Sequence, residues 1–168
     1  MADLFNSSYG PKFAVPQVAK EISSFMRAEP LFRYKVTIGS DSERLAGGRA
    51  DFVSAIVVHR VGNGGRYFWR RLELDRFHTL RDRILKEVFL SLDLGKEVLI
   101  ELRKLSVSDG PGAAVVPQWD FEIHVDVGEN GETKAMIQEV VGMIRAHNFE
   151  AIVKPDSYAA SNVADRYV

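Results

Sequence analysis

Apolar and polar residues alternate in three consecutive segments of the first half of the chain. In YKVTIGS, residues 34–40, tyrosine, valine and isoleucine alternate with polar or small residues, the period-two pattern of a strand with one buried face. Residues 51–61 and 66–74 are similarly rich in β-formers, and the GNGG sequence at 62–65 between them is a tight-turn signal. The pattern predicts a three-stranded antiparallel meander.

A helical period replaces the alternation further along the chain. Apolar residues recur every three or four positions and predict a helix over residues 79–105, with a break expected near Gly95. A loop is expected over residues 106–117. The segment QWDFEIHVDV then predicts a fourth strand over residues 118–127.

Shorter elements are predicted after the GENGE turn. Residues 136–144 have apolar side chains at helical spacing, and residues 150–154 are typical of a short strand. The segment SYAASNVADRYV predicts a terminal helix with Asp156 or Ser157 as its cap. Helix-linked strands require right-handed crossovers, which place the strand at 118–127 parallel to an earlier one.

The order of elements predicts a mixed α/β fold. We expect a five-stranded mixed sheet with three antiparallel strands first, flanked by helices on both faces. A short amphipathic helix at residues 16–28 precedes the sheet, so residues 1–30 are interpreted as an accessory segment and residues 31–168 as a single domain.

Composition narrows the class of protein. A chain of 168 residues with 46% hydrophobic and 27% charged content suits one soluble domain. The absence of cysteine excludes disulfides, thiolate metal sites and cysteine nucleophiles. A net charge of −1 argues against a strongly basic nucleic-acid coat. Because the sequence has no apolar run of membrane-spanning length and no signal-peptide pattern at its start, a cytoplasmic protein is expected.

Three acids are predicted to meet at one end of the sheet. Asp41 and Asp126 follow strand patterns that would lie side by side and parallel, and open α/β sheets place their sites at such strand ends. Glu87 falls inside the apolar stripe of its helix, where an acid is costly unless it is paired, protonated or bound to metal. The other interpretations are an Asx turn at Asp41 and a turn before the next helix at Asp126.

Clustered carboxylates indicate a particular chemistry. At a separation of roughly 5 Å, each pair repels by about 3 kcal/mol at an effective dielectric near 20. The cluster must therefore raise its pKa values or recruit cations, and hard oxygen ligands suit Mg²⁺ or Mn²⁺. Two such ions about 4 Å apart activate water and stabilise the leaving oxygen of a phosphodiester, which is nuclease chemistry.

Four short motifs resemble those of a known family. The segments TIGSDS, LRDRILKE, HVDVGENGETKAMI and KPDSYAASNVAD occur in this order within residues 34–168, and together they resemble the ribonuclease H-like superfamily, most closely its YkuK-type bacterial family. The resemblance implies a ribonuclease H-like fold with two Mg²⁺ or Mn²⁺ ions held by Asp41, Glu87, Asp126 and Asp165. Asp165, from the N-x-x-A-D pattern, is otherwise a solvated residue on a frayed terminal helix.

Basic and aromatic residues alternate between positions 66 and 86. This mixture grips nucleic acid through phosphate pairing and base stacking, and it makes Trp69, Arg70 and Arg71 candidate substrate-binding residues. The alternative is an edge strand protected by charge beside a solvated helix face. Lys154 is a further candidate for phosphate contact, and it otherwise caps a strand end.

Two remaining polar residues have structural interpretations. His124, on the same strand face as Asp126, is interpreted as a packed histidine in preference to a ligand or proton shuttle. Asp156 is interpreted as a helix cap in preference to a site residue.

The sequence supports two main functional hypotheses. The first is a metal-dependent nuclease acting on RNA, DNA or a hybrid. The second is a catalytically inactive ribonuclease H-like module that binds nucleic acid or a protein partner. A nucleotide-binding regulator is disfavoured because the sequence lacks a glycine-rich fingerprint.

Overall fold

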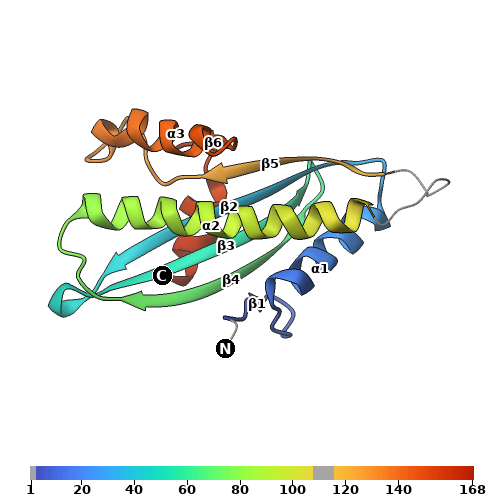
Figure 1. Cartoon of the computed structure of the whole chain (residues 1–168), viewed down its shortest axis with the longest axis horizontal. Coiled ribbons are helices and arrows are strands. Elements are labelled where there is room, and N and C mark those ends of the chain that lie inside the picture. Colours follow the sequence, from blue (N-terminus) through green and yellow to red (C-terminus); the bar gives the residue numbers. More distant parts are fainter. Residues whose placement is uncertain (1–2, 108–115) are drawn as a thin grey trace.

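The computed structural model describes residues 3–107 and 116–168, which form one mixed sheet with three helices on one face and a helical C-terminal segment on the other (Figure 1). The strand order is β1-β4-β3-β2-β5-β6. Strands β2, β3 and β4 are antiparallel, and β5 and β6 run parallel to β2. The strands are β1 (Asn6–Ser7), β2 (Arg33–Arg44), β3 (Ala50–Arg60), β4 (Gly65–Leu74), β5 (Gln118–His124) and β6 (Glu150–Ile152).

The mixed α/β class, the antiparallel meander and the helices on both faces are confirmed, but the sheet has six strands where five were expected. The additional strand is β1, in which Asn6 and Ser7 pair with Trp69 and Phe68 of β4. Two residues are too few to produce a period-two pattern, so the sequence gives no signal for this strand.

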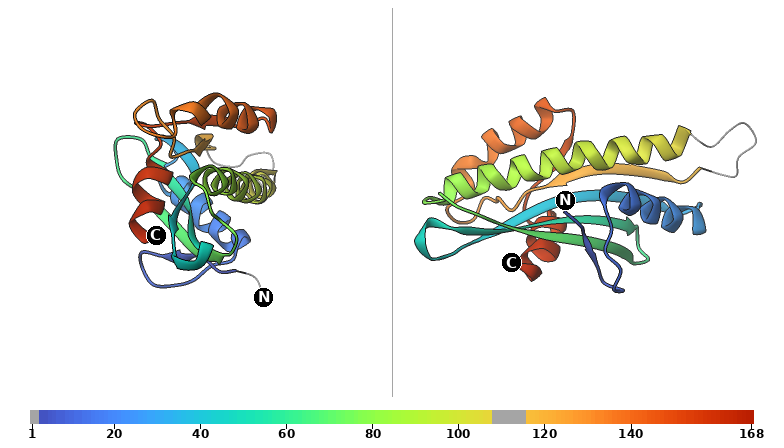
Figure 2. Two further views of the ribbon diagram at one scale, coloured as in Figure 1. Left: turned by 90° about the vertical axis from the view of Figure 1, so that its left-hand side faces the viewer. Right: turned by 60° about the horizontal axis from the view of Figure 1, so that its bottom comes forward.

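The helices divide unequally between the two faces of the sheet. Helices α1 (Val15–Ala28), α2 (Leu80–Val107) and α3 (Ile137–Ala146) share one hydrophobic core with the sheet. The opposite face is covered by the π-helical segment η3 (Ala159–Ala164) and the short helix α4 (Asp165–Tyr167). The left view of Figure 2 shows α2 and the C-terminal segment on opposite sides of the sheet. Two 3₁₀ turns, η1 (Ala46–Gly48) and η2 (Lys134–Met136), complete the structure.

Three strands end two or more residues away from their predicted ends. Strand β2 continues to Arg44, because its ladder with β3 extends to the pair Arg44–Ala50, so Asp41 lies within the strand and not after it. Strand β5 ends at His124, its last partner in the β2 ladder being Gly39. Strand β6 likewise ends at Ile152 instead of residue 154. Asp126 therefore lies two residues beyond the end of β5.

Helix α2 is continuous through Gly95, and the expected break is wrong. A β-carbon at Gly95 would lie 2.9 Å from Cδ1 of Ile123 on β5. Glycine at this position allows the helix to approach the sheet closely, so its role is packing and not helix termination. Residues 108–115, which make up most of the loop expected at 106–117, lie outside the described residues.

The N-terminal segment is packed into the same core as the sheet. Phe5, Val18 and Ile22 are fully buried and belong to the hydrophobic cluster formed with β2, β3 and α2. Contacts therefore run across the boundary expected at residue 31.

Three serine hydroxyls connect α2 to the middle of the sheet. Ser91 of α2 donates to Ser40 of β2 over 2.8 Å, and Ser40 is 2.8 Å from Ser54 of β3. Side chains alternate along a strand, so Ser40 and Ser42 face α2, whereas Gly39 and Asp41 face η3 and α4. These hydroxyl hydrogen bonds fix α2 on the sheet at Ser91, one helical turn away from Glu87.

Within the described residues, no helix combines the length and the apolar character needed to cross a bilayer.

Candidate active site

Asp41 is held on the sheet face covered by the C-terminal segment. Its residue exposure is only 9%, and its carboxyl group lies next to that of Asp165 of α4, where the two can share a hydrogen bond only when one of them is protonated. Burial, followed by the Asp165 hydrogen bond and the nearby charge of Asp126, raises the pKa of Asp41 to about 7. When Asp41 ionises, its negative charge is poorly compensated by the neighbouring protein groups.

Glu87 approaches from the opposite side of β2. It is 5% exposed, as expected for an acid on the inward stripe of α2, and its Oε1 accepts a 2.5 Å hydrogen bond from Ser42 Oγ. Burial raises the pKa of Glu87 to about 8, with further increases from Asp41 and Asp126, while Ser42 and Arg83 act in the opposite direction. Arg83 also donates to the carbonyl oxygen of Ser42 over 3.0 Å, so it braces the residue that holds Glu87.

Asp126 lies beside β2 where no strand is paired on that side. Its Oδ1 accepts a hydrogen bond of 2.7 Å from Ser161 of η3 and forms an ion pair of 3.1 Å with Lys154 Nζ. Strand β5 ends at His124, so β2 has no paired strand on this side next to Asp126. Asp126 therefore interacts electrostatically with both Asp41 and Glu87, whose side chains lie on opposite faces of the sheet. The structure thus links the four predicted acids through pairwise interactions centred on Asp41, with Lys154 beside Asp126.

The chemistry of this donor set fits a hard divalent cation. The set offers carboxylate oxygens only, and two of its members have pKa values raised by burial and mutual repulsion, a condition that a cation relieves. Within residues 3–107 and 116–168, however, no three His, Asp or Glu side chains are already arranged to hold a metal ion. The acids are instead engaged by protein partners: Asp41 by Asp165, Glu87 by Ser42, and Asp126 by Lys154 and Ser161.

The raised pKa of Glu87 predicts a pH-dependent stability. The folded protein retains a proton that the unfolded chain releases between about pH 4.5 and pH 8, so the contribution of Glu87 is most favourable below this window and declines through it. In metal-free buffer at pH 8.5, Glu87→Gln is expected to raise the free energy of unfolding by on the order of 2 kcal/mol. Urea unfolding at pH 5 and pH 8.5 measures the difference.

The matched control is Glu97→Gln, which alters an exposed acid of the same helix and should change stability little at either pH. A Glu87→Gln protein less stable than the wild type at pH 8.5 would contradict the assignment of an uncompensated buried carboxyl.

The other substrate-binding candidates lie on β4, on both faces of the sheet. Trp69 and Arg71 face the C-terminal segment: Trp69 stacks on Tyr167 with ring centroids 4.0 Å apart, and Arg71 pairs with Asp51 over 3.1 Å. Arg70 points to the opposite face, where its guanidinium lies 4.8 Å from the ring centroid of Phe5. The three residues therefore do not form one surface, and only Trp69 and Arg71 share a face with Asp41.

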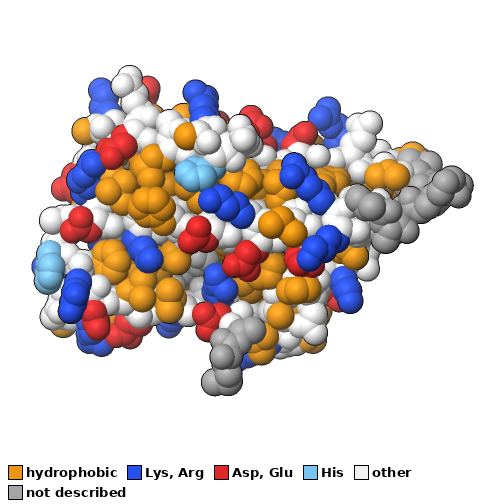
Figure 3. Space-filling model, in the orientation of Figure 1, with side chains coloured by type: hydrophobic (Ala, Val, Ile, Leu, Met, Phe, Trp, Pro, Cys, Tyr) orange, Lys and Arg blue, Asp and Glu red, His pale blue; other side chains and the backbone are white. Residues whose placement is uncertain are grey.

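The α2 face shows mixed charge. In Figure 3, lysine and arginine side chains are interspersed with acidic ones and with hydrophobic patches. This face has no extended basic field of the kind that tracks a phosphate backbone.

His124 and Asp156, the two residues for which a structural role was predicted, have different outcomes. His124 is 1% exposed, its Nδ1 accepts a hydrogen bond from the Ala159 amide over 3.1 Å, and its Nε2 lies 3.0 Å from Glu122. Burial lowers the pKa of His124. It is a packed histidine that anchors the start of η3. Asp156 is exposed and is not the cap. Ser157 precedes the helical segment, and its carbonyl oxygen accepts the amides of Ala160 and Ser161, but the side chain that accepts a first-turn amide is that of His124.

The residues that support the acids were not predicted from the sequence. Ser42 and Arg83 hold Glu87, and Ser161 holds Asp126. Arg83 precedes Glu87 by one helical turn, a spacing that indicates a contact once Glu87 is selected. The sequence around Ser42 and Ser161 does not indicate their contacts with Glu87 and Asp126. These contacts depend on β2 continuing past the end of β5, which is known only from the folded sheet.

The chain resembles known proteins along almost its whole length. A family model described as Ribonuclease H-like matches residues 17–168. The uncharacterized protein YkuK of Bacillus subtilis (strain 168) is 31% identical over 176 aligned positions, which cover 99% of each chain. No solved structure gives a significant match.

Proposed function

Because this chain belongs to the ribonuclease H-like family, with a YkuK-type relative along its whole length, we propose that it is a metal-dependent nuclease that hydrolyses phosphodiester bonds of nucleic acid. The observation that carries the proposal is the convergence of Asp41 and Glu87, two buried acids with raised pKa values, on Asp126 at an open end of the β5 ladder. A folded chain retains such a cluster at a cost in stability, which indicates a function.

Asp41, Glu87, Asp126 and Asp165 are the residues proposed to hold Mg²⁺ or Mn²⁺, with two ions expected. Bound ions of this kind supply Lewis-acid activation of water and of the phosphoryl group. The protein's own part is to hold the four carboxylates from four separate elements and to exclude bulk water from Asp41 and Glu87, which are both buried.

Lys154 is proposed to bind a substrate phosphate. Its side chain is 45% exposed and its ammonium nitrogen lies 3.1 Å from Asp126, so it stands at the solvent side of the acids. A hollow of about 620 Å³ beside it, lined by Gly128, Asn130 and Ser161 among others, gives room for a nucleotide. Of the other residues predicted to bind substrate, Arg71 and Trp69 lie on the same sheet face as Asp41 but are occupied by Asp51 and Tyr167, and Arg70 lies on the other face.

The test is cleavage of labelled single-stranded, duplex and hybrid oligonucleotides in Mn²⁺ or Mg²⁺, with EDTA as the metal-free control. Metal-dependent cleavage of one substrate class supports the proposal and names the substrate. Absence of cleavage with every substrate would count against it.

Metal binding gives an independent prediction. Addition of 5 mM Mn²⁺ to the metal-free protein is expected to raise the thermal unfolding midpoint by several degrees, since an ion that binds only the folded state stabilises it by mass action: about 2.7 kcal/mol when the ion is at a hundred times its dissociation constant. Differential scanning calorimetry measures the shift, and Ca²⁺-free buffer with EDTA provides the baseline.

One observation favours the second hypothesis, an inactive binding module. The acids are all engaged by protein groups, and the described residues present no ready-made three-ligand site. A protein that binds an oligonucleotide without being stabilised by Mn²⁺ would have this second function.

A further inference from the structure

The last helical turn of the described chain holds one of the four acids. Helix α4 has only three residues, Asp165–Tyr167, and continues directly from η3, and such a terminal turn frays unless other contacts hold it. The carboxyl group of Asp165 nevertheless lies beside that of Asp41. Contacts outside the helix must therefore fix its position.

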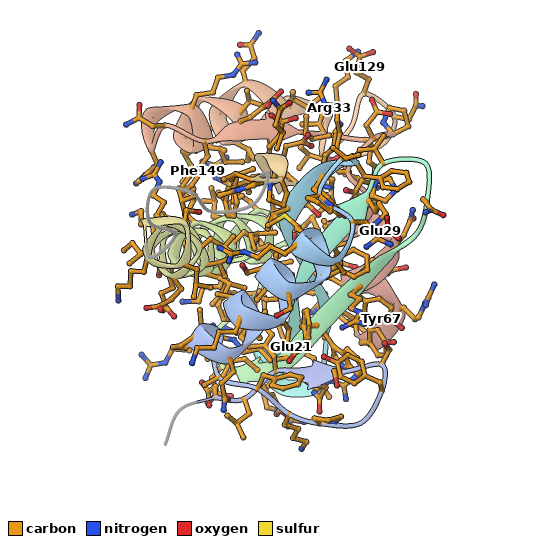
Figure 4. All side chains as sticks on the ribbon, turned by 90° about the vertical axis from the view of Figure 1, so that its right-hand side faces the viewer. Glu21, Glu29, Arg33, Tyr67, Glu129 and Phe149 are labelled. Atoms are coloured by element: carbon orange, nitrogen blue, oxygen red, sulfur yellow. The ribbon has the colours of Figure 1, made fainter. Side chains whose placement is uncertain are left out.

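Those contacts converge on Tyr167. Its ring stacks on Trp69 with an interplanar angle of 13° and a centroid distance of 4.0 Å, and its hydroxyl lies 2.9 Å from the hydroxyl of Tyr67. Arg71 donates a hydrogen bond to the Tyr167 carbonyl oxygen. All three partners lie on β4 and face the same side, away from α2; Figure 4 shows Tyr67 beside the C-terminal ribbon. We refer to Tyr67, Trp69 and Arg71 as the β4 dock.

The two ends of α4 contact different strands. Asp165 reaches Asp41 on β2, while Tyr167 reaches β4, and β3 lies between these strands. In the sheet register, Asp41 is opposite Val53 and Val53 is opposite Arg71, which gives a span of about 10 Å from β2 to β4. Helix α4 thus bridges β3, over a small apolar cluster of Val53, Ala55 and Ala164.

We infer that Tyr167 is a positioning residue of the metal centre: its engagement in the β4 dock holds α4 so that Asp165 faces Asp41. The inference rests on the proposed function, because it concerns Asp165 as a ligand for a divalent cation. It assigns Trp69 and Arg71 a framework role in place of direct contact with nucleic acid. Tyr167 already covers the face of Trp69 on which a base would stack.

The test is Mn²⁺ binding by isothermal titration calorimetry, with no substrate present, to the full chain and three variants. Tyr167→Ala and Trp69→Leu are expected to bind Mn²⁺ about ten-fold more weakly, the usual effect of removing a group that orients a ligand. Tyr167→Phe keeps the stacked ring and should bind within about two-fold of the wild type. Phe89→Ala, which removes an exposed aromatic ring from α2, is the control and should leave affinity unchanged.

A readout that needs no metal accompanies the titration. Amide hydrogen exchange in η3 and α4 is expected to be faster in Tyr167→Ala than in the wild type, and to be restored in Tyr167→Phe. Unchanged exchange in Tyr167→Ala would overturn the inference even if the wild type bound no Mn²⁺, an outcome that would itself overturn the proposed metal centre.

The remaining outcomes are also decisive. Wild-type Mn²⁺ affinity in both Tyr167→Ala and Trp69→Leu would show that the dock does not position Asp165. If those variants kept Mn²⁺ affinity but differed from the wild type in binding a fluorescent single-stranded oligonucleotide, the β4 dock would be a substrate platform, and the inference would be wrong.

Discussion

Asp41→Asn is expected to lower the rate of Mn²⁺-dependent cleavage by at least about 1,000-fold, corresponding to several kcal/mol of lost transition-state stabilisation. Asparagine keeps the shape of the side chain but cannot supply an anionic oxygen, and Asp41 is the acid that interacts with both Asp165 and Asp126. The measurement is the initial rate on whichever substrate the wild type cleaves, at saturating Mn²⁺.

The same substitution should not harm the fold. The pKa of Asp41 is raised to about 7 in the folded protein, so ionisation of this group opposes folding above its unfolded pKa near 3.8. Replacing the carboxyl by a neutral amide removes this unfavourable contribution to the free energy of folding. Without metal at pH 8, Asp41→Asn is therefore expected to be as stable as the wild type or more stable. Asp93→Asn, at an exposed position of α2, is the control and should match the wild type in both rate and stability.

Two results would count against a catalytic role for Asp41. Full cleavage by Asp41→Asn would show that catalysis does not use this carboxylate. A loss of activity accompanied by an equally large loss of stability would show only that Asp41 is needed for folding.

Gly39→Ala is expected to lower the free energy of unfolding by about 3 kcal/mol, at the upper end of the usual cost of overpacking a core position. An ideal β-carbon at Gly39 would lie 2.4 Å from the backbone nitrogen of Ala160 and 2.6 Å from the carbonyl carbon of Ala159. Neither atom belongs to a flexible side chain, so η3 as a whole would have to move away from β2. The movement would also displace Ser161, which binds Asp126.

The control for this prediction is Gly142→Ala. Gly142 lies within α3, and a β-carbon there would meet no atom within 4 Å. Since alanine is the better helix former, this variant should gain up to about 1 kcal/mol. Urea unfolding of both proteins distinguishes steric exclusion at Gly39 from a general effect of replacing glycine; equal stabilities of the two variants would contradict the close approach of η3.

Prediction from sequence succeeded where one residue's environment follows from local periodicity. The alternation in β2 and the stripe in α2 were sufficient to place Glu87 against the sheet, and the parallel crossover was sufficient to bring Asp126 toward Asp41. Both inferences need only the geometry of one element and the handedness of a connection.

Prediction failed where position depends on unequal strand lengths or on contacts distant in sequence. Nothing local to Asp41 states that β2 continues three residues beyond it, because that extension depends on pairing with β3. The sequence pattern around Trp69 and Arg71 is the same whether a nucleic acid or Tyr167 occupies that face of the sheet. Tyr167 lies about a hundred residues further along the chain, so nothing local to Trp69 indicates the contact. The identity of the occupant comes only from the assembled fold.

The two-residue strand β1 has a consequence for how molecules of this protein meet one another. It pairs with Phe68 and Trp69 in the middle of β4 and so interrupts what would otherwise be a ten-residue free edge. Beyond it, β4 continues with Arg70, Arg71 and Glu73, and the opposite edge of the described sheet, β6, has only three residues. Interrupted, charged or short edges are poor templates for strand addition by a neighbouring chain, so this sheet is protected against edge-to-edge aggregation at both sides.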